Sequence, residues 1–196
     1  MKTFEKFRQH CLQENYPIMS QEVLEEILHY LNQRKQASVL ELGSCVGYSA
    51  IVLASNSNTR IVSIERDMER HILAKENVKK FGLEPLIKMV YDDALTFETT
   101  DTYDFIIFDA AKAQNQAFLD RYLPHLNNEG VIFIDNVDFH GLTSNVDSIT
   151  GKNLRSMVRK LKSFEENLLL RQDLDVTHKS VGDGLLIIRK KRLSGK

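Results

Sequence analysis

The sequence has few cysteines and no long hydrophobic stretch. Only two of its 196 residues are cysteine, and Cys11 and Cys45 lie too far apart for a metal-binding or redox motif. No apolar run approaches the ~20 residues needed to cross a membrane. The first six residues are mixed in charge, unlike a signal peptide. We therefore expect a cytoplasmic protein with reduced thiols and no membrane partner.

The sequence also lacks internal repeats, low-complexity tracts and linkers. A chain of this length with 42% hydrophobic residues can bury a core of ordinary size, so we predict a single domain over residues 1–196. Within it we expect a helical N-terminal segment at 1–33 and a nucleotide-binding core at 36–196.

Charge is unevenly distributed, although the formal net charge is only −1. Residues 152–196 contain 12 Lys and Arg against 5 Asp and Glu, whereas residues 1–151 contain 14 against 22. Such a basic region is typical of a surface that faces nucleic acid, and equally of a solvated helix face followed by a basic tail. Its basic clusters are Lys152, Arg155, Arg159, Lys160, Lys162 and the tail Arg189, Lys190, Lys191 and Arg192.

The stretch 39–50 organises the rest of the chain. An apolar run that ends in an acid is followed by Gly43 and Gly47, and a helix pattern starts near Tyr48. This order predicts a buried strand, a tight turn and a helix whose free N–H groups face a ligand, with glycines that allow close approach of the backbone. The dinucleotide fingerprint requires glycine where this chain has Cys45 and Tyr48, so a pyrophosphate ligand is disfavoured.

Strand and helix patterns alternate along the remaining chain. They predict an α/β fold with a doubly wound, mostly parallel, seven-stranded sheet that ends in an antiparallel hairpin. The predicted strands are 39–42, 60–65, 86–91, 103–109, 131–136, 168–176 and 184–189. The predicted helices are 1–16, one that begins at Ser20, one near Tyr48, 67–81, 116–126 and 151–167.

Polar side chains follow several of these strands at their carboxyl ends, where open α/β sheets bind ligands. Glu65 lies 22 residues beyond Gly43, and an acid at that place can accept both ribose hydroxyls. Asp109 follows the fourth strand, and Asp135 and Asn136 follow the fifth, without histidine or cysteine beside them. Oxygen donors of this kind suit Mg²⁺ better than zinc.

The stretch Glu41-Leu42-Gly43-Ser44-Cys45-Val46-Gly47-Tyr48-Ser49 resembles the nucleotide-binding motif of class I S-adenosylmethionine-dependent methyltransferases. It has the form used by the metal-dependent O-methyltransferases, a group that includes catechol and caffeoyl-CoA enzymes and bacterial tRNA 5-hydroxyuridine methyltransferases. The resemblance extends from about residue 16 to residue 189. It implies a Rossmann-like fold, S-adenosylmethionine and a divalent cation as cofactors, and a homodimer.

The resemblance also implies roles for individual residues. The cofactor contacts that it implies are Met19, Glu41, Gly43, Gly47, Ser49, Glu65, Asp93, Ala94 and Asp109. The implied metal ligands are Asp109, Asp135 and Asn136. Lys112 matches the lysine of the family's Asp-x-x-Lys motif, and with Asp109 it is the implied catalytic pair. The cation would lower the pKa of an acceptor hydroxyl, and Lys112 would take up or stabilise the departing proton.

The acceptor is predicted from the segments 109–114 and 135–137 with His140-Gly141, which look most like the tRNA enzymes. The main prediction is methylation of 5-hydroxyuridine at the wobble position of tRNA, with tRNA as partner. His140 lies either on the substrate side or in a solvent-exposed loop. The alternatives are a small catechol-like or caffeoyl-CoA-like phenol as acceptor, a nicotinamide-dependent dehydrogenase, and a non-catalytic RNA-binding module on an inactive methyltransferase fold.

Overall fold

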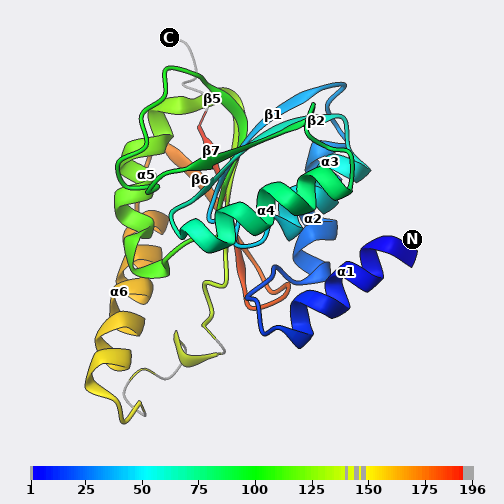
Figure 1. The fold of residues 1–196 in the computed structure, drawn as a ribbon. Coiled ribbons are helices and arrows are strands. Elements are labelled where there is room, and N and C mark those ends of the chain that lie inside the picture. The colour runs from blue at the N-terminus through cyan, green and yellow to red at the C-terminus, as the bar shows by residue number, and fades with distance from the viewer. Residues whose placement is uncertain (1, 140, 144–145, 147–148, 192–196) are drawn as a thin grey trace.

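The computed structural model describes residues 2–139, 141–143, 146 and 149–191 and is built on one seven-stranded sheet (Figure 1). The strands are β1 (Ala37–Leu42), β2 (Thr59–Glu65), β3 (Ile87–Tyr91), β4 (Tyr103–Phe108), β5 (Leu126–Asp135), β6 (Leu174–Lys179) and β7 (Leu185–Lys190). Their order in space is β3-β2-β1-β4-β5-β7-β6. Strands β1 to β5 are parallel, and β7 is antiparallel to β5 and β6. The predicted fold class is confirmed.

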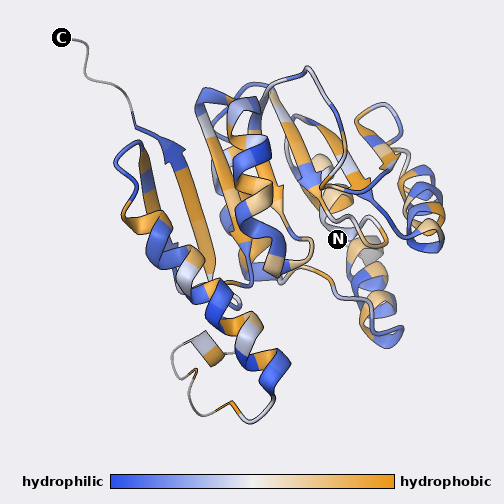
Figure 2. Cartoon of the chain, turned by 90° about the vertical axis from the view of Figure 1, so that its left-hand side faces the viewer, coloured by the Kyte–Doolittle hydropathy of each residue, from blue (hydrophilic) through white to orange (hydrophobic). Residues whose placement is uncertain are grey.

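Helices cover both faces of the sheet. They are α1 (Lys2–Gln13), α2 (Gln21–Leu31), α3 (Tyr48–Asn56), α4 (Met68–Lys80), α5 (Asn115–Tyr122) and α6 (Lys152–Leu169), with two short 3-10 helices, η1 (Lys112–Gln114) and η2 (Leu123–His125). The first four pack on one face, and α5 and α6 pack on the other (Figure 1). In Figure 2 the strands are largely hydrophobic, whereas the covering helices carry hydrophilic residues along their outer sides.

Side-chain caps precede two of the helices. Ser20 precedes α2, and its hydroxyl accepts a hydrogen bond from the Val23 N–H at 3.3 Å. Asp67 precedes α4, and its carboxylate accepts from the Arg70 N–H at 3.0 Å. Gly82 follows the end of α4 with φ +67°, a conformation that glycine adopts without a steric penalty.

The N-terminal helix α1 packs against the main body. Phe7 and Cys11 are buried there, and the Phe7 ring lies 5.7 Å from the Tyr48 ring and 5.3 Å from the Phe81 ring. Tertiary packing therefore stabilises a helix that is too short and polar to form alone. Among the described helices, none is long and apolar enough to cross a membrane.

Two strands begin well away from their predicted first residues. Strand β5 begins at Leu126 instead of residue 131, because Gly130 continues the strand at a place where a Cβ would lie 2.9 Å from the Asp104 carbonyl oxygen. Strand β6 begins at Leu174 instead of residue 168, because α6 continues to Leu169. Leu168 is buried on the helix, so its apolar character serves helix packing and not a strand.

The topology brings the polar strand ends together. The chain moves outward from β1 to β2 and β3, then returns to the other side of β1 as β4. The connections after β1 and β4 therefore leave the sheet in opposite directions and open a crevice at the carboxyl edge.

Candidate active site

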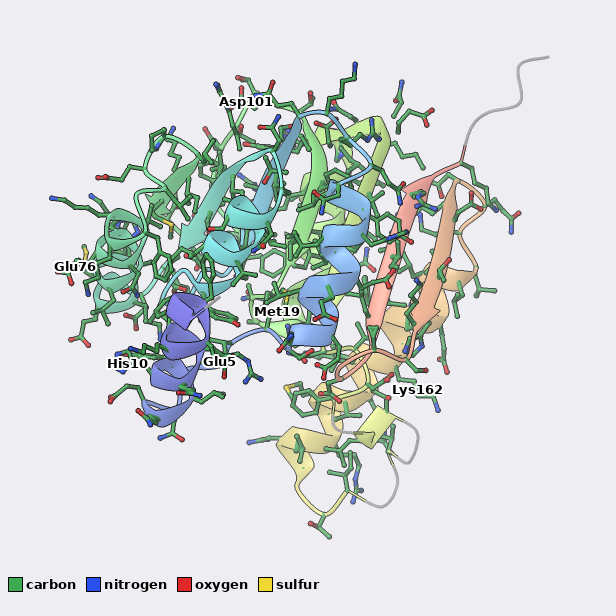
Figure 3. All side chains as sticks on the ribbon, turned by 90° about the vertical axis from the view of Figure 1, so that its right-hand side faces the viewer. Glu5, His10, Met19, Glu76, Asp101 and Lys162 are labelled. Carbon is green, nitrogen blue, oxygen red and sulfur yellow. The ribbon has the colours of Figure 1, made fainter. Side chains whose placement is uncertain are left out.

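A cavity of about 310 Å³ lies at this carboxyl edge. The turn after β1, the ends of β2 and β3, the residues after β4, and Asn136 after β5 all line it. Met19 closes another side from the connection between α1 and α2 and is almost fully buried (Figure 3). The cavity is within the usual range for small-molecule sites.

The glycines of the turn allow close packing within the protein, and their predicted contact with a cofactor stays a prediction. Gly43 has φ +94°, and a Cβ there would lie 2.6 Å from the carbonyl oxygen of Asp109. Gly47 has φ +82°, and a Cβ there would touch Ala74 of α4 at 3.4 Å. Gly43 lines the cavity, whereas Gly47 is not among its lining residues. Both glycines thus permit close contacts between segments of the protein, and Gly43 also borders the space that a ligand would fill.

Glu41 is not among the residues that line the cavity, and its predicted contact with a cofactor stays a prediction. Its side chain is fully buried behind the turn, where both carboxylate oxygens accept hydrogen bonds, one from the Ser49 hydroxyl and one from the Ser63 hydroxyl. Burial raises the pKa of Glu41 to about 7, although the two serines act in the opposite direction. Ser49 does line the cavity, so Glu41 acts on the site by holding Ser49 in place.

Glu65 lines the cavity at the end of β2 and is 8% exposed. One carboxylate oxygen accepts from the Cys45 N–H at 2.8 Å, and the other accepts from the Asp67 N–H at 2.9 Å. These bonds fix the carboxylate before any ligand arrives and leave lone pairs for further donors. Glu65 therefore stays our predicted ribose ligand.

The segment after β3 forms the neighbouring wall. Asp93 and Ala94, which are two of the predicted cofactor contacts, both line the cavity. The Asp93 carboxylate accepts from the Leu95 N–H at 2.8 Å, and it lies 3.4 Å from the Arg66 guanidinium. The Ala94 carbonyl accepts from the Tyr122 hydroxyl at 2.6 Å. Their contact with an adenine ring stays a prediction.

Ser44 is a lining residue that the sequence argument did not single out. Its hydroxyl is buried and has no hydrogen-bond partner in the described part of the protein. Buried polar groups are almost always paired, so this hydroxyl fits a ligand that occupies the cavity. The position of Ser44 between Gly43 and Cys45, within the glycine turn, was the sequence signal that could have identified it as a site residue.

Two carboxylates stand at the carboxyl ends of the neighbouring strands β4 and β5: Asp109 is partly exposed and lines the cavity, whereas Asp135 is buried and is not among the lining residues. Asp109 follows β4, and its carboxylate forms an ion pair with the Lys112 ammonium at 3.0 Å. Asp135 ends β5 at 1% exposure, and it accepts from the Asn136 N–H at 2.8 Å. Burial, followed by the negative charge of Asp109, raises the pKa of Asp135 to about 6. Burial also raises the pKa of Asp109.

This donor set fits a hard divalent cation. Two carboxylates that disfavour each other's ionisation gain from a positive charge between them, and Asn136 adds an amide at the edge of the cavity. No three His, Cys, Asp or Glu side chains are grouped for metal binding among the described residues, so Asn136 or solvent would have to complete the coordination. The metal site stays a prediction.

A larger groove of about 910 Å³ adjoins this side of the cavity. Helix α6 forms one wall, and its first turns extend beyond the sheet (Figure 1). The predicted basic residues that line the groove are Lys152, Arg155, Arg159 and Lys160. Lys112 lines both the groove and the cavity. Asn115, which sequence reasoning did not identify, is 2% exposed and also lines the groove.

The other predicted basic residues lie elsewhere, so the C-terminal third does not form one basic surface. Lys162 is exposed on α6 and is not among the groove residues (Figure 3). Lys190 donates to the Leu126 carbonyl at the amino end of β5, opposite the site. Arg189 lies over the Tyr30 ring at 5.1 Å. Arg192 and His140 are outside the described residues.

Comparison with known proteins identifies relatives over nearly the whole chain. A family model described as O-methyltransferase matches residues 2–191. A crystal structure of a Staphylococcus aureus protein, provisionally assigned as a caffeoyl-CoA O-methyltransferase, shares 29% identity and a TM-score of 0.90, covering 96% of this chain and 92% of that one.

Two further relatives are informative. An O-methyltransferase from Bacillus cereus, solved in complex with SAH, has 25% identity and a TM-score of 0.81, covering 97% of this chain and 91% of that one. A flavonoid 3′,5′-methyltransferase from Vitis vinifera is 25% identical over 197 residues, which cover 90% of this chain and 78% of the relative.

Proposed function

This chain belongs to the O-methyltransferase family, and from that membership we propose that it transfers the methyl group of S-adenosylmethionine to a hydroxyl of a small phenolic acceptor of the catechol or caffeoyl-CoA type. The similar proteins named above support both halves of the proposal. One is bound to SAH, the demethylated product of the donor, and two carry names that specify phenolic acceptors.

One observation carries the proposal. The cavity beside the glycine turn is lined on one side by Asp109, Lys112 and Asn136, and the buried Asp135 ends the neighbouring strand β5 next to them. A methyl donor in the cavity would face an oxygen held by these groups. In a single displacement the acceptor oxygen bonds to the methyl carbon while the carbon–sulfur bond breaks, and proximity and alignment supply much of the rate.

The cofactor side binds and orients the donor. Glu65 presents carboxylate oxygens to the ribose hydroxyls, and the Ser44 hydroxyl gains the partner that it lacks within the described protein. Met19 covers the cavity from the α1–α2 connection and helps to exclude water from the sulfonium.

The acceptor side handles the proton and the charge of the phenol. Asp109, Asp135 and Asn136 would hold a divalent cation, which when bound supplies positive charge that favours the ionised phenol. The Lys112 ammonium, positioned by its ion pair with Asp109, donates to the phenolate oxygen and keeps it at the edge of the cavity. Lys112 thus stabilises the oxygen's negative charge, which is simpler than a general-base role for an ammonium already paired with a carboxylate.

The second candidate acceptor is 5-hydroxyuridine in tRNA. The basic groove beside Lys112 favours it, because phosphate contacts from Lys and Arg dominate the affinity of proteins for nucleic acid. The relatives reported above name small phenols, and for that reason the phenolic acceptor comes first.

The test is methyl transfer from labelled S-adenosylmethionine to catechol, caffeoyl-CoA and tRNA that contains 5-hydroxyuridine, each with Mg²⁺ and with a chelator. We expect label on a phenol and loss of that label with the chelator. Label on tRNA alone would replace the phenolic acceptor by the second candidate. Transfer that a chelator leaves unchanged would remove the cation from the proposal.

A further inference from the structure

We propose that the groove along α6 is a binding site for phosphate groups of the acceptor, so that the acceptor is anchored there while its hydroxyl reaches Lys112. This inference rests on the proposed methyl transfer, because it names a chemical feature of the molecule that is methylated. Its evidence is separate and comes from the charge, burial and position of the groove residues.

The groove is lined by positive charge alone. Its charged lining residues are Lys112, Lys152, Arg155, Arg159 and Lys160, and no aspartate or glutamate lines it in the described part of the chain. Arg155 is held in place, because its guanidinium donates to the Ile149 carbonyl at 2.7 Å. Lys152 and Lys160 form no ion pair with any described residue. Five basic side chains brought together in one groove, two of them lysines without an ion pair among the described residues, match an anion that carries more than one negative oxygen.

A buried amide provides a second and independent sign of a ligand. Asn115 is the first residue of α5, lines the groove and is only 2% exposed. Its Nδ2 has no hydrogen-bond partner within the described residues. Since buried donors are rarely left unpaired, an acceptor atom of a ligand at this wall would complete the site. Phosphate oxygens accept hydrogen bonds from amides as well as from lysines.

The position of Lys112 joins the groove to the chemistry. It lines both the groove and the methyl-donor cavity, so a single acceptor can occupy the groove with one end and present a hydroxyl at the cavity with the other. The groove volume of about 910 Å³ exceeds the 310 Å³ of the cavity, which leaves room for a substantial anionic portion outside the reacting end. A bare catechol would leave the groove empty.

The test compares two double variants that each remove two lysine charges. Lys152→Ala/Lys160→Ala removes two positive charges from the groove. The matched control, Lys80→Ala/Lys162→Ala, removes two exposed lysines outside the groove. Binding of coenzyme A, a phosphate-bearing probe without the phenol, is measured by calorimetry. KM is measured for caffeoyl-CoA and for catechol.

We expect the groove variant to weaken coenzyme A binding about tenfold or more and to raise KM for caffeoyl-CoA by a similar factor, with KM for catechol within about twofold of the wild type. The control should match the wild type in every assay. Asn115→Asp keeps the shape of the side chain but places a negative carboxylate next to the phosphate. It should therefore also weaken coenzyme A binding. An equal rise in KM for both phenols would overturn the proposal.

A tRNA binding assay on the same variants identifies the source of the phosphate. The wild type could bind tRNA but not coenzyme A, with the groove variant binding tRNA more weakly. That result would keep the phosphate site and assign it to nucleic acid. If the wild type binds neither probe, or if both double variants bind them equally, the proposal is wrong. Failure to methylate any acceptor would refute the proposed function instead, because probe binding is measured without methyl transfer.

Discussion

The two sides of the carboxyl edge are built on different physical principles. On the cofactor side, after β1, β2 and β3, the acids are engaged by the protein's own donors: Glu41 by two serine hydroxyls and Glu65 by two backbone N–H groups. On the acceptor side, after β4 and β5, charged groups gather: the partly exposed Asp109 and the buried Asp135 stand beside one lysine, and a basic groove lies next to them.

The difference shows how each side selects its ligand. On the cofactor side, hydrogen bonds within the protein fix the positions of the polar groups before a ligand binds. This side therefore selects a ligand whose own polar groups match those positions. Excess charge makes the acceptor side depend on bound ions and on the charge of the substrate, because a buried charge without a partner is costly. Variants that exchange these properties test the contrast.

The largest expected effect is at Asp135. Asp135→Asn keeps an oxygen to accept from the Asn136 N–H but removes a buried negative charge. We expect methyl transfer to fall about 10³-fold, equivalent to several kcal/mol of lost electrostatic stabilisation, while SAH binds within about tenfold of wild type. In the presence of a chelator we also expect a higher Tm, because the repulsion from Asp109 is gone.

Calorimetric titration with SAH, a methyl-transfer assay and thermal unfolding test this prediction together. Asp175→Asn, on the exposed face of β6, is the control for removing an aspartate charge. If SAH affinity and turnover fell by the same factor, Asp135 would belong to the cofactor side, and the contrast would be lost.

Gly43→Ala tests whether close packing shapes the cofactor side. A methyl group there would lie 2.6 Å from the Asp109 carbonyl oxygen, on a residue with φ +94°. We expect the free energy of unfolding to fall by about 2–5 kcal/mol, the sum of left-handed backbone strain and overpacking. Gly82→Ala is the matched control, since φ is +67° and nothing lies within 4 Å of its Cβ.

The control should lose only about 1–2 kcal/mol, the strain alone. Urea unfolding of both variants measures the difference. Equal losses would mean that the turn relaxes away from Asp109 without cost, and close packing would then have no part in the shape of the site.

Glu41 makes the stability of the cofactor side depend on pH. Burial raises its folded-state pKa from the ordinary 4.5 to about 7, so the folded protein holds this proton more tightly than the unfolded chain does. Its contribution to stability is therefore complete below about pH 4.5, declines as the pH rises to about 7, and is constant above that. The total change has an upper limit of about 3 kcal/mol.

Glu41→Gln removes this titration, because the amide carries no charge at any of these pH values. Urea unfolding at pH 5 and pH 8 should show a smaller loss of stability in the variant than in the wild type. Glu98→Gln, at an exposed position, should behave like the wild type. Parallel pH profiles for Glu41→Gln and the wild type would contradict the raised pKa.

The smallest expected effect is at Glu65. Glu65→Gln keeps one acceptor oxygen but turns an amide N–H₂ toward one of the two backbone donors, Cys45 or Asp67. We expect SAH affinity to fall by about 1–3 kcal/mol, because polar groups in the site lose their partners. Calorimetry measures the affinity, and Glu69→Gln in the first turn of α4 is the control. Unchanged affinity would remove Glu65 from the cofactor site.

Local patterns predicted the elements well and their limits less well. The cap at Ser20 is read from a residue next to the helix that it starts, and the structure confirms it. The start of β5 and the end of α6 were wrong, since Gly130 and Leu168 take their roles from neighbours far away in the chain. A strand pattern and a helix pattern look alike over a few apolar residues.

The site was predictable to a similar extent. Acids at strand ends could be placed at one edge because parallel strands share an edge, and Glu65 and Asp109 do line one cavity. Glu41 has the same local pattern, yet its side chain points behind the turn to Ser49 and Ser63. The alternation of side chains along a strand does not tell which partner a buried acid will find.

By itself, the sequence determined the order of strands and helices, the turn at 43–47 and the set of acids available at the carboxyl edge, because these depend on local periodicity and on spacing along the chain. Only the tertiary structure decided that Gly43 packs on Asp109 and that the basic residues separate into a groove beside Lys112 and a tail at the far end of β5. Such contacts join residues distant in the chain, and the folded backbone alone sets how near they come.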